Sequence, residues 1–132
     1  MKNCFREFWL LGALAVLASI GGTGPVYAED APPAAQKIYE KLLGAIQAGD
    51  REAFVADGTD AVKQGTTKQV IDLLAKQVGS RLKKGYDAEY LCQLKQAGHE
   101  VYLWKLKFKD EGDDVVARIA VKDGKVAGFY LQ

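Results

Sequence analysis

The hydrophobic positions of this chain change their period near residue 85, from helical spacing before it to alternation with polar residues after it. In the first part, apolar residues three and four positions apart predict an amphipathic helix over 34–48. Gly49 ends this helix, and Asp50 can cap a second short helix over 51–56. The chain therefore begins its folded part with helices.

A third helix is predicted over 66–84, where Thr66 and Gln69 have the spacing of a capping box. Leu73 falls outside its apolar stripe, so we expect this side chain to be partly exposed or to touch a neighbouring element. The intervening stretch 61–65 is too short to assign. The stripe itself consists of Val70, Ile71, Leu74, Ala75, Val78 and Leu82.

Four alternating segments follow, and short glycine-bearing turns separate them. Connections this short force neighbouring strands to run antiparallel. An apolar sheet face must be covered, and the helices supply the matching stripes. We therefore predict an α+β fold with three N-terminal helices packed on a curved four-stranded antiparallel meander. The strands are expected at 86–95, 99–109, 114–122 and 126–131.

The register of the first hairpin follows from pairing like residues with like. A three-residue loop over 96–98 sets Tyr90 opposite Trp104 and Cys92 opposite Tyr102. A one-residue slip would move every side chain to the other face. On the other face the same register pairs acids with lysines: Glu89 with Lys105, and Asp87 with Lys107.

The other two hairpins are less uniform. A four-residue second loop sets Trp104 against Ile119 and Leu106 against Ala117. In the third, a tight Asp123-Gly124 turn pairs Phe129 with Arg118, whereas a longer loop that includes Lys125 sets Phe129 beside Ile119. We expect a β-bulge that reconciles the two. The predicted inner face carries Tyr90, Cys92, Tyr102, Trp104, Leu106, Phe108, Ala117 and Ile119.

The outer face mixes charged and apolar side chains, so two interpretations stay open. It is either solvated or a homodimer surface, with an apolar patch at one end. Its polar members are Glu89, Gln93, Lys105, Lys107 and Arg118. Its apolar members are Leu91, Val101, Leu103, Val116 and Ala120.

Two local patterns resemble those of the nuclear transport factor 2-like superfamily, whose members have the cystatin-like cone. The stretch 48–54 resembles that family's turn between the first two helices, and 121–129 resembles its closing hairpin. The resemblance covers 34–132 as one domain. It implies a cone whose open end can hold a pocket between the first helix and the concave sheet, and frequent homodimers packed through the sheet. It does not fix a function.

Residues 1–28 have the three parts of a secretory signal, with cleavage expected after Ala28 and a short linker over 29–33. The apolar run is too short to span a bilayer comfortably, so only an uncleaved signal would hold the chain at a membrane. We expect export, to a periplasm or to the medium. Removing residues 1–28 from the 132-residue chain leaves 104 residues with 16 cationic and 16 anionic side chains, which does not favour nucleic-acid binding.

Candidate catalytic chemistry is sparse. The one histidine, His99, lies at the edge of a turn, and the one cysteine outside the signal, Cys92, lies in an alternating apolar run. We therefore expect no catalytic residue, no metal site and no cofactor. We interpret the acidic loop over 110–114 as a solvent-exposed hairpin turn rather than a cation site. The leading hypothesis is a non-enzymatic domain that binds a small apolar molecule or a protein. Its pocket residues would be Tyr39, Tyr90, Tyr102 and Trp104.

Two alternatives remain. The first is an isomerase or hydro-lyase with a base inside the cone. A one-residue error in the predicted register of the first strand would turn the Glu89 carboxylate inward, so the direction of Glu89 distinguishes this alternative from the binding domain. The second is a structural homodimer with a filled core.

Overall fold

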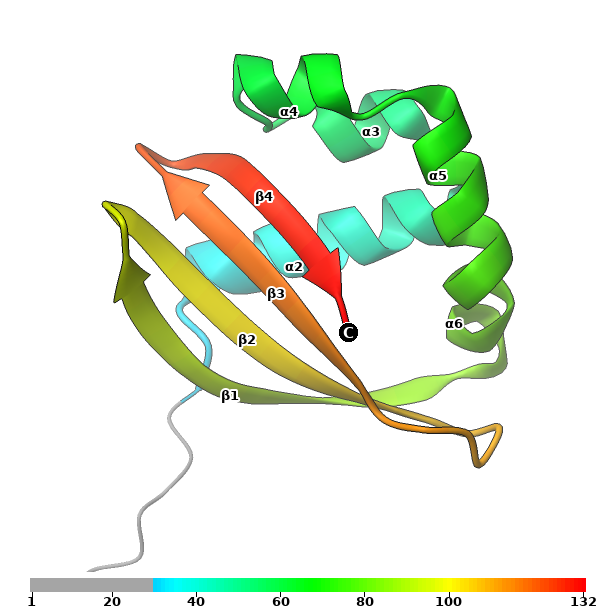
Figure 1. Cartoon of the computed structure of the whole chain (residues 1–132). Helices are drawn as coiled ribbons and strands as arrows, with labels where there is room; N and C mark the ends of the chain where they lie inside the picture. The colour runs from blue at the N-terminus through cyan, green and yellow to red at the C-terminus, as the bar shows by residue number, and fades with distance from the viewer. Residues whose placement is uncertain (1–29) are drawn as a thin grey trace, which may run out of the picture.

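The computed structural model describes residues 30–132, so the predicted secretory signal lies outside the described residues (Figure 1). The helical elements are α2 (Pro33–Ala48), α3 (Arg51–Val55), α4 (Asp60–Gly65), α5 (Lys68–Leu74), the π-helical segment η2 (Ala75–Gly79) and α6 (Ser80–Lys84). The strands are β1 (Tyr86–Gln96), β2 (His99–Phe108), β3 (Val115–Lys122) and β4 (Lys125–Leu131).

The predicted α+β class is confirmed. The four strands form one antiparallel sheet in the order β1-β2-β3-β4, and the sheet is strongly curved (Figure 1). The helices lie on one side of it, with α2 running across the sheet (Figure 1). Helix α5 lies on the β4 side, and α6 lies next to β2. The fold thus has one helix-covered face and one back face.

The first two helices begin and end where the sequence indicates. Pro33 opens α2, because a residue at this position needs no N–H partner. Gly49 ends the helix in the left-handed conformation, with φ at 66°. The Asp50 side chain then accepts a hydrogen bond from the Ala53 N–H at 3.0 Å and so caps α3.

The third predicted helix differs in two respects. Its N-terminal cap is Thr67 and not Thr66: the Thr67 hydroxyl accepts from the Val70 N–H at 3.3 Å. The Thr66 carbonyl instead accepts a bond from Arg51, which lies on another element. The predicted capping box of Thr66 and Gln69 is therefore wrong, because the cap is the next threonine. The stretch left unassigned is the short helix α4.

The first hairpin corrects the expected register. Ala97 and Gly98 form a two-residue turn, both with positive φ (48° and 76°), where a three-residue loop was expected. Tyr90 still pairs with Trp104, but a bulge at Leu91 shifts the rest of the strand. Cys92 therefore lies opposite Leu103 on the back face instead of opposite Tyr102, and Gln93 takes the position opposite Tyr102.

The second and third hairpins keep the expected faces. Trp104 pairs with Ala117 instead of Ile119, a shift of two residues, which preserves the side of the sheet that each residue occupies. In the third hairpin the tight turn and the bulge both occur. Lys122 pairs with Lys125 across the turn, and Phe129 lies beside Ile119.

The core lies between the helices and the inner sheet face. Its largest fully buried side chains there are Trp104, Tyr39, Ile46, Ile71, Leu106, Ile119 and Val126. Val101 is also buried, at 1 % exposure, but alternation places it on the back face and outside this cluster. Leu73 is 55 % exposed, as its position outside the stripe predicts.

Candidate functional site

The four side chains predicted to line a pocket come together in the structure. The Tyr39 ring stacks on Trp104 with centroids 4.5 Å apart, and Tyr90 meets Trp104 edge-on at 5.3 Å. Tyr102 lies next to the same indole at 6.2 Å. Tyr39, Tyr102 and Trp104 are at most 7 % exposed, so these three rings pack mainly on one another and on the core.

Two polar atoms inside this aromatic cluster are unsatisfied. Within residues 30–132, neither the Tyr39 hydroxyl nor Trp104 Nε1 has a hydrogen-bond partner of acceptable geometry. Burial, and then the nearby Tyr86 phenol, raise the pKa of Tyr39 far above its ordinary value. By contrast, the Tyr102 hydroxyl donates to Glu100 at 3.0 Å, and burial is the main reason that its pKa rises to about 12.

Among residues 30–132, no carboxylate is buried in this interior. Glu89 lies on the back face opposite Lys105, with Lys105 Nζ 2.8 Å from Glu89 Oε2. Its side chain is 55 % exposed. Among the described residues no charged side chain is buried, and no three histidines, cysteines or acids lie close enough to share a metal ion.

The acidic loop is held by an arginine. Arg81 on α6 donates two bonds to Asp110, from Nε at 2.8 Å and from Nη2 at 3.1 Å. Arg81 Nη2 also reaches the Asp113 carbonyl oxygen, and the guanidinium lies 3.9 Å from the centroid of the Phe108 ring. The Arg81 hydrogen bond and the Gly112 N–H lower the pKa of Asp110 to about 2. This loop is thus a structural clamp between α6 and the sheet.

A cleft of about 300 Å³ opens between the helices and the edge strand β4. Three aromatic rings and four aliphatic side chains form most of its wall. It is lined by Phe54, Val62, Gly65, Thr66, Val70, Leu74, Ala127, Gly128, Phe129 and Tyr130. Because these residues come from α3, α4, α5 and β4, the apolar pattern of no single element could indicate the cleft.

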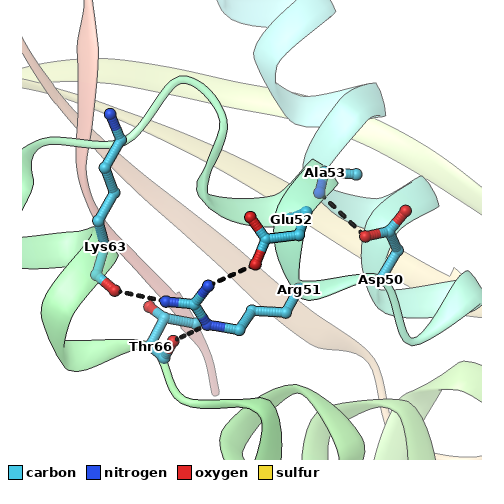
Figure 2. Close-up of polar contacts among 6 residues, drawn as sticks. All are labelled: Asp50, Arg51, Glu52, Ala53, Lys63 and Thr66. Carbon is cyan, nitrogen blue, oxygen red and sulfur yellow. Dashed lines mark hydrogen bonds and ion pairs between the residues drawn. The ribbon is translucent and has the colours of Figure 1, made fainter.

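Arg51 joins two of the elements that line the cleft, and Figure 2 shows its polar contacts. Its Nε donates to the Thr66 carbonyl at 2.7 Å, and its Nη2 donates to the Lys63 carbonyl at 2.7 Å. Its Nη1 lies 2.6 Å from Glu52 Oε1. The guanidinium therefore satisfies carbonyls at the end of α4 and ties this helix to α3, on which Phe54 points into the cleft wall.

Backbone groups of β4 also reach this cleft. Val116 and Gln132 exchange two hydrogen bonds, at 2.6 and 3.1 Å. Since bonded and non-bonded pairs alternate in an antiparallel ladder, Phe129 and Leu131 turn their N–H and C=O away from β3. Phe129 thus presents a peptide donor and acceptor at the open sheet edge beside an apolar wall.

The comparison with solved structures finds similar chains. The chain is similar to a protein from Novosphingobium aromaticivorans that is described as an uncharacterized cystatin fold protein, with 16% sequence identity and a TM-score of 0.41. The match covers 73% of this chain and 95% of that chain. No protein-family model matches the chain, and the search of curated proteins finds no match.

In the part of the chain that the structure describes, no helix is both long and apolar enough to cross a membrane.

Proposed function

We propose that this chain is an exported, non-enzymatic domain that binds a small apolar molecule in the cleft between α3, α4, α5 and β4. The observation that carries the proposal is the combination of apolar walls with the outward peptide group of Phe129. Ligand sites typically have this composition, a mostly apolar lining with a few fixed polar groups. The cleft volume, about 300 Å³, is at the small end of such sites.

The aromatic cluster of Tyr39, Tyr102 and Trp104 supports this role as a rigid floor rather than as the binding surface. Its members are buried and stacked, so a ligand among them would have to displace core contacts. The outward direction of Glu89 argues against a base in the cone, which the isomerase alternative requires.

Two exposed residues on the same helix provide the test. Val70 lines the cleft and is 42% exposed, whereas Leu73 is 55% exposed and is absent from the cleft lining. A glutamate at either position keeps a good helix former and costs little stability. A glutamate at position 70 places its charge in the cleft, so a bound apolar ligand would bury that charge without a partner and bind more weakly. A glutamate at position 73 lies outside the cleft and has no such effect.

The probe is indole, a neutral ring with one N–H donor, titrated into ¹⁵N-labelled protein while the amide spectrum is recorded. We expect saturable shifts of the Phe129 and Val62 amides, which line the cleft. Binding should be at least roughly tenfold weaker in Val70→Glu and unchanged in Leu73→Glu. Equal binding by both variants, or no shift along β4, would contradict the proposal. Native mass spectrometry of the secreted protein tests cleavage after Ala28 and reveals any ligand that is retained.

A further inference from the structure

A second hollow, of about 350 Å³, lies on the back of the sheet, near the tips of the first and third hairpins. It differs from the cleft in chemistry because it contains a guanidinium, an imidazole and a phenol. It is lined by Gln96, Ala97, His99, Val101, Arg118, Ala120, Ala127, Gly128 and Tyr130.

Arg118 is the polar centre of this hollow. Its Nη2 donates to Gln96 Oε1 at 2.6 Å, and among the described residues it reaches no other hydrogen-bond acceptor. A guanidinium carries five N–H donors in a planar fork, so most of those on Arg118 remain for a ligand. The guanidinium carbon, Arg118 Cζ, lies 5.9 Å from the centroid of the Tyr130 ring, and this contact helps to hold the guanidinium over β4.

The charges on this part of the back face are cationic. Strand alternation places Lys122 on the same face as Arg118, and Lys125 lies opposite Lys122. His99 begins β2 at the same end of the sheet, with Nδ1 2.9 Å from the Ala97 carbonyl oxygen.

Acidic groups near the hollow face elsewhere or are paired. Glu100 alternates to the helix side, where Tyr102 donates to it. Glu89, on the back face, is bound by Lys105 at 2.8 Å, and Asp123 lies in the exposed turn between β3 and β4. A ligand that enters the hollow therefore meets mainly positive charge.

The remaining wall is apolar and includes an aromatic face. Val101 is 1% exposed and Ala120 lies opposite it on β3. A Cβ at Gly128 would lie 3.1 Å from Tyr130 Cε2, so the ring rests over a glycine, where no side chain competes for the space. Tyr130 is nevertheless 59% exposed, which leaves part of its ring surface accessible.

We propose that this hollow binds a small aromatic carboxylate. The two carboxylate oxygens accept a forked pair of hydrogen bonds from Arg118, and the aromatic ring packs on Tyr130 and the Val101–Ala120 floor. The ligand is inferred to be a carboxylate because the planar guanidinium binds two carboxylate oxygens at once. It is inferred to carry an aromatic ring because the remaining wall of the hollow is flat and apolar. This site opens on the back of the sheet and the cleft on the helix side, and the two share Ala127, Gly128 and Tyr130 of β4 as a common wall.

The test uses the ¹⁵N-labelled secreted protein at constant ionic strength, titrated separately with benzoate, benzyl alcohol and inorganic phosphate. Benzoate is expected to shift the amides of Ala97, His99 and Ala120 with saturation, because these three residues line the hollow and not the cleft. Arg118→Gln should weaken benzoate at least roughly tenfold, the effect of losing a charge-assisted pair. Arg118→Lys, which keeps the charge and loses the fork, should fall between that variant and the natural chain.

Two control variants distinguish the loss of this site from a general change in surface charge and from a change in the cleft. Lys107→Gln removes an exposed cation from the same sheet face, away from the hollow lining, and should leave benzoate binding within about twofold. Val70→Glu should also leave it unchanged, so the cleft and the hollow can fail separately. The proposal is overturned if benzoate shifts no amide of the hollow, if Arg118→Gln binds it equally well, or if benzyl alcohol or phosphate binds as tightly as benzoate.

Discussion

The unsatisfied hydroxyl of Tyr39 gives a prediction with an unusual sign: removing it should stabilise the protein. The side chain is 2% exposed, and within residues 30–132 its hydroxyl has no hydrogen-bond partner of acceptable geometry. A buried hydroxyl without a partner costs roughly 1–3 kcal/mol, since its bonds to water are lost on folding. Tyr39→Phe keeps the ring that stacks on Trp104 at 4.5 Å and removes only the polar atom.

We therefore expect Tyr39→Phe to raise the free energy of unfolding by about 1–2 kcal/mol. In a domain of this size, each kcal/mol corresponds to roughly 4–8 °C in melting temperature. Urea denaturation measures the change directly, and the slope m should stay the same because the same surface is exposed on unfolding.

Tyr102→Phe is the matched control. Its hydroxyl donates to Glu100 at 3.0 Å, so the same atomic deletion should lower stability by about 0.5–1.5 kcal/mol. A loss of stability in Tyr39→Phe would refute the reasoning, because it would mean that the hydroxyl is satisfied in solution. The neighbouring Tyr86 phenol would then be its partner, and Tyr86→Phe should show an equal loss.

Three further changes test other parts of the structure. Arg81 lowers the pKa of Asp110 to about 2, so the stability that Asp110→Asn removes should be fully present above about pH 5. It should decline as the pH falls and be lost only as the pH passes below about 2, as measured by urea denaturation across that range. A difference that stays constant from about pH 5 to about pH 2 would contradict the ion pair. If the back of the sheet packs against a second copy, Leu103→Lys should halve the native mass seen by light scattering, and an unchanged dimer would exclude this surface. Gly49→Ala should lower the free energy of unfolding by about 1–2 kcal/mol in thermal unfolding, because Gly49 has a φ of 66°. Gly44 lies in the interior of α2 with open space around it, so Gly44→Ala should be neutral or stabilising by up to about 1 kcal/mol. Equal effects of the two substitutions would contradict the left-handed cap.

Local chemistry explains what could be predicted from the residues alone. The change from helical to alternating period, the Gly49 end of α2 and the Asp50 cap of α3 each depend on neighbours within a few positions. The antiparallel meander follows from short turns, and the ion pair between Glu89 and Lys105 follows from register near the middle of the first hairpin.

The errors arise where two local choices are nearly equal and distant contacts decide between them. The capping-box spacing to Gln69 favours Thr66 over the adjacent Thr67, but Arg51 binds the Thr66 carbonyl, and the helix starts one residue later. Likewise, a bulge at Leu91 allows a tight turn at Ala97-Gly98 while Tyr90 stays on the core face. Only packing against the helices makes this combination better than a three-residue loop.

The candidate sites show the same division most clearly. The sequence identified aromatic residues that do meet, such as Tyr39 and Trp104, because inner-face positions can be read from alternation. It could not show that they stack into a floor while the space opens elsewhere, beside Phe129 and over Arg118. Those hollows depend on how helices and hairpin tips from distant parts of the chain approach one another. Periodicity determines which side of an element is apolar, but the docking of whole elements determines where that surface stays uncovered.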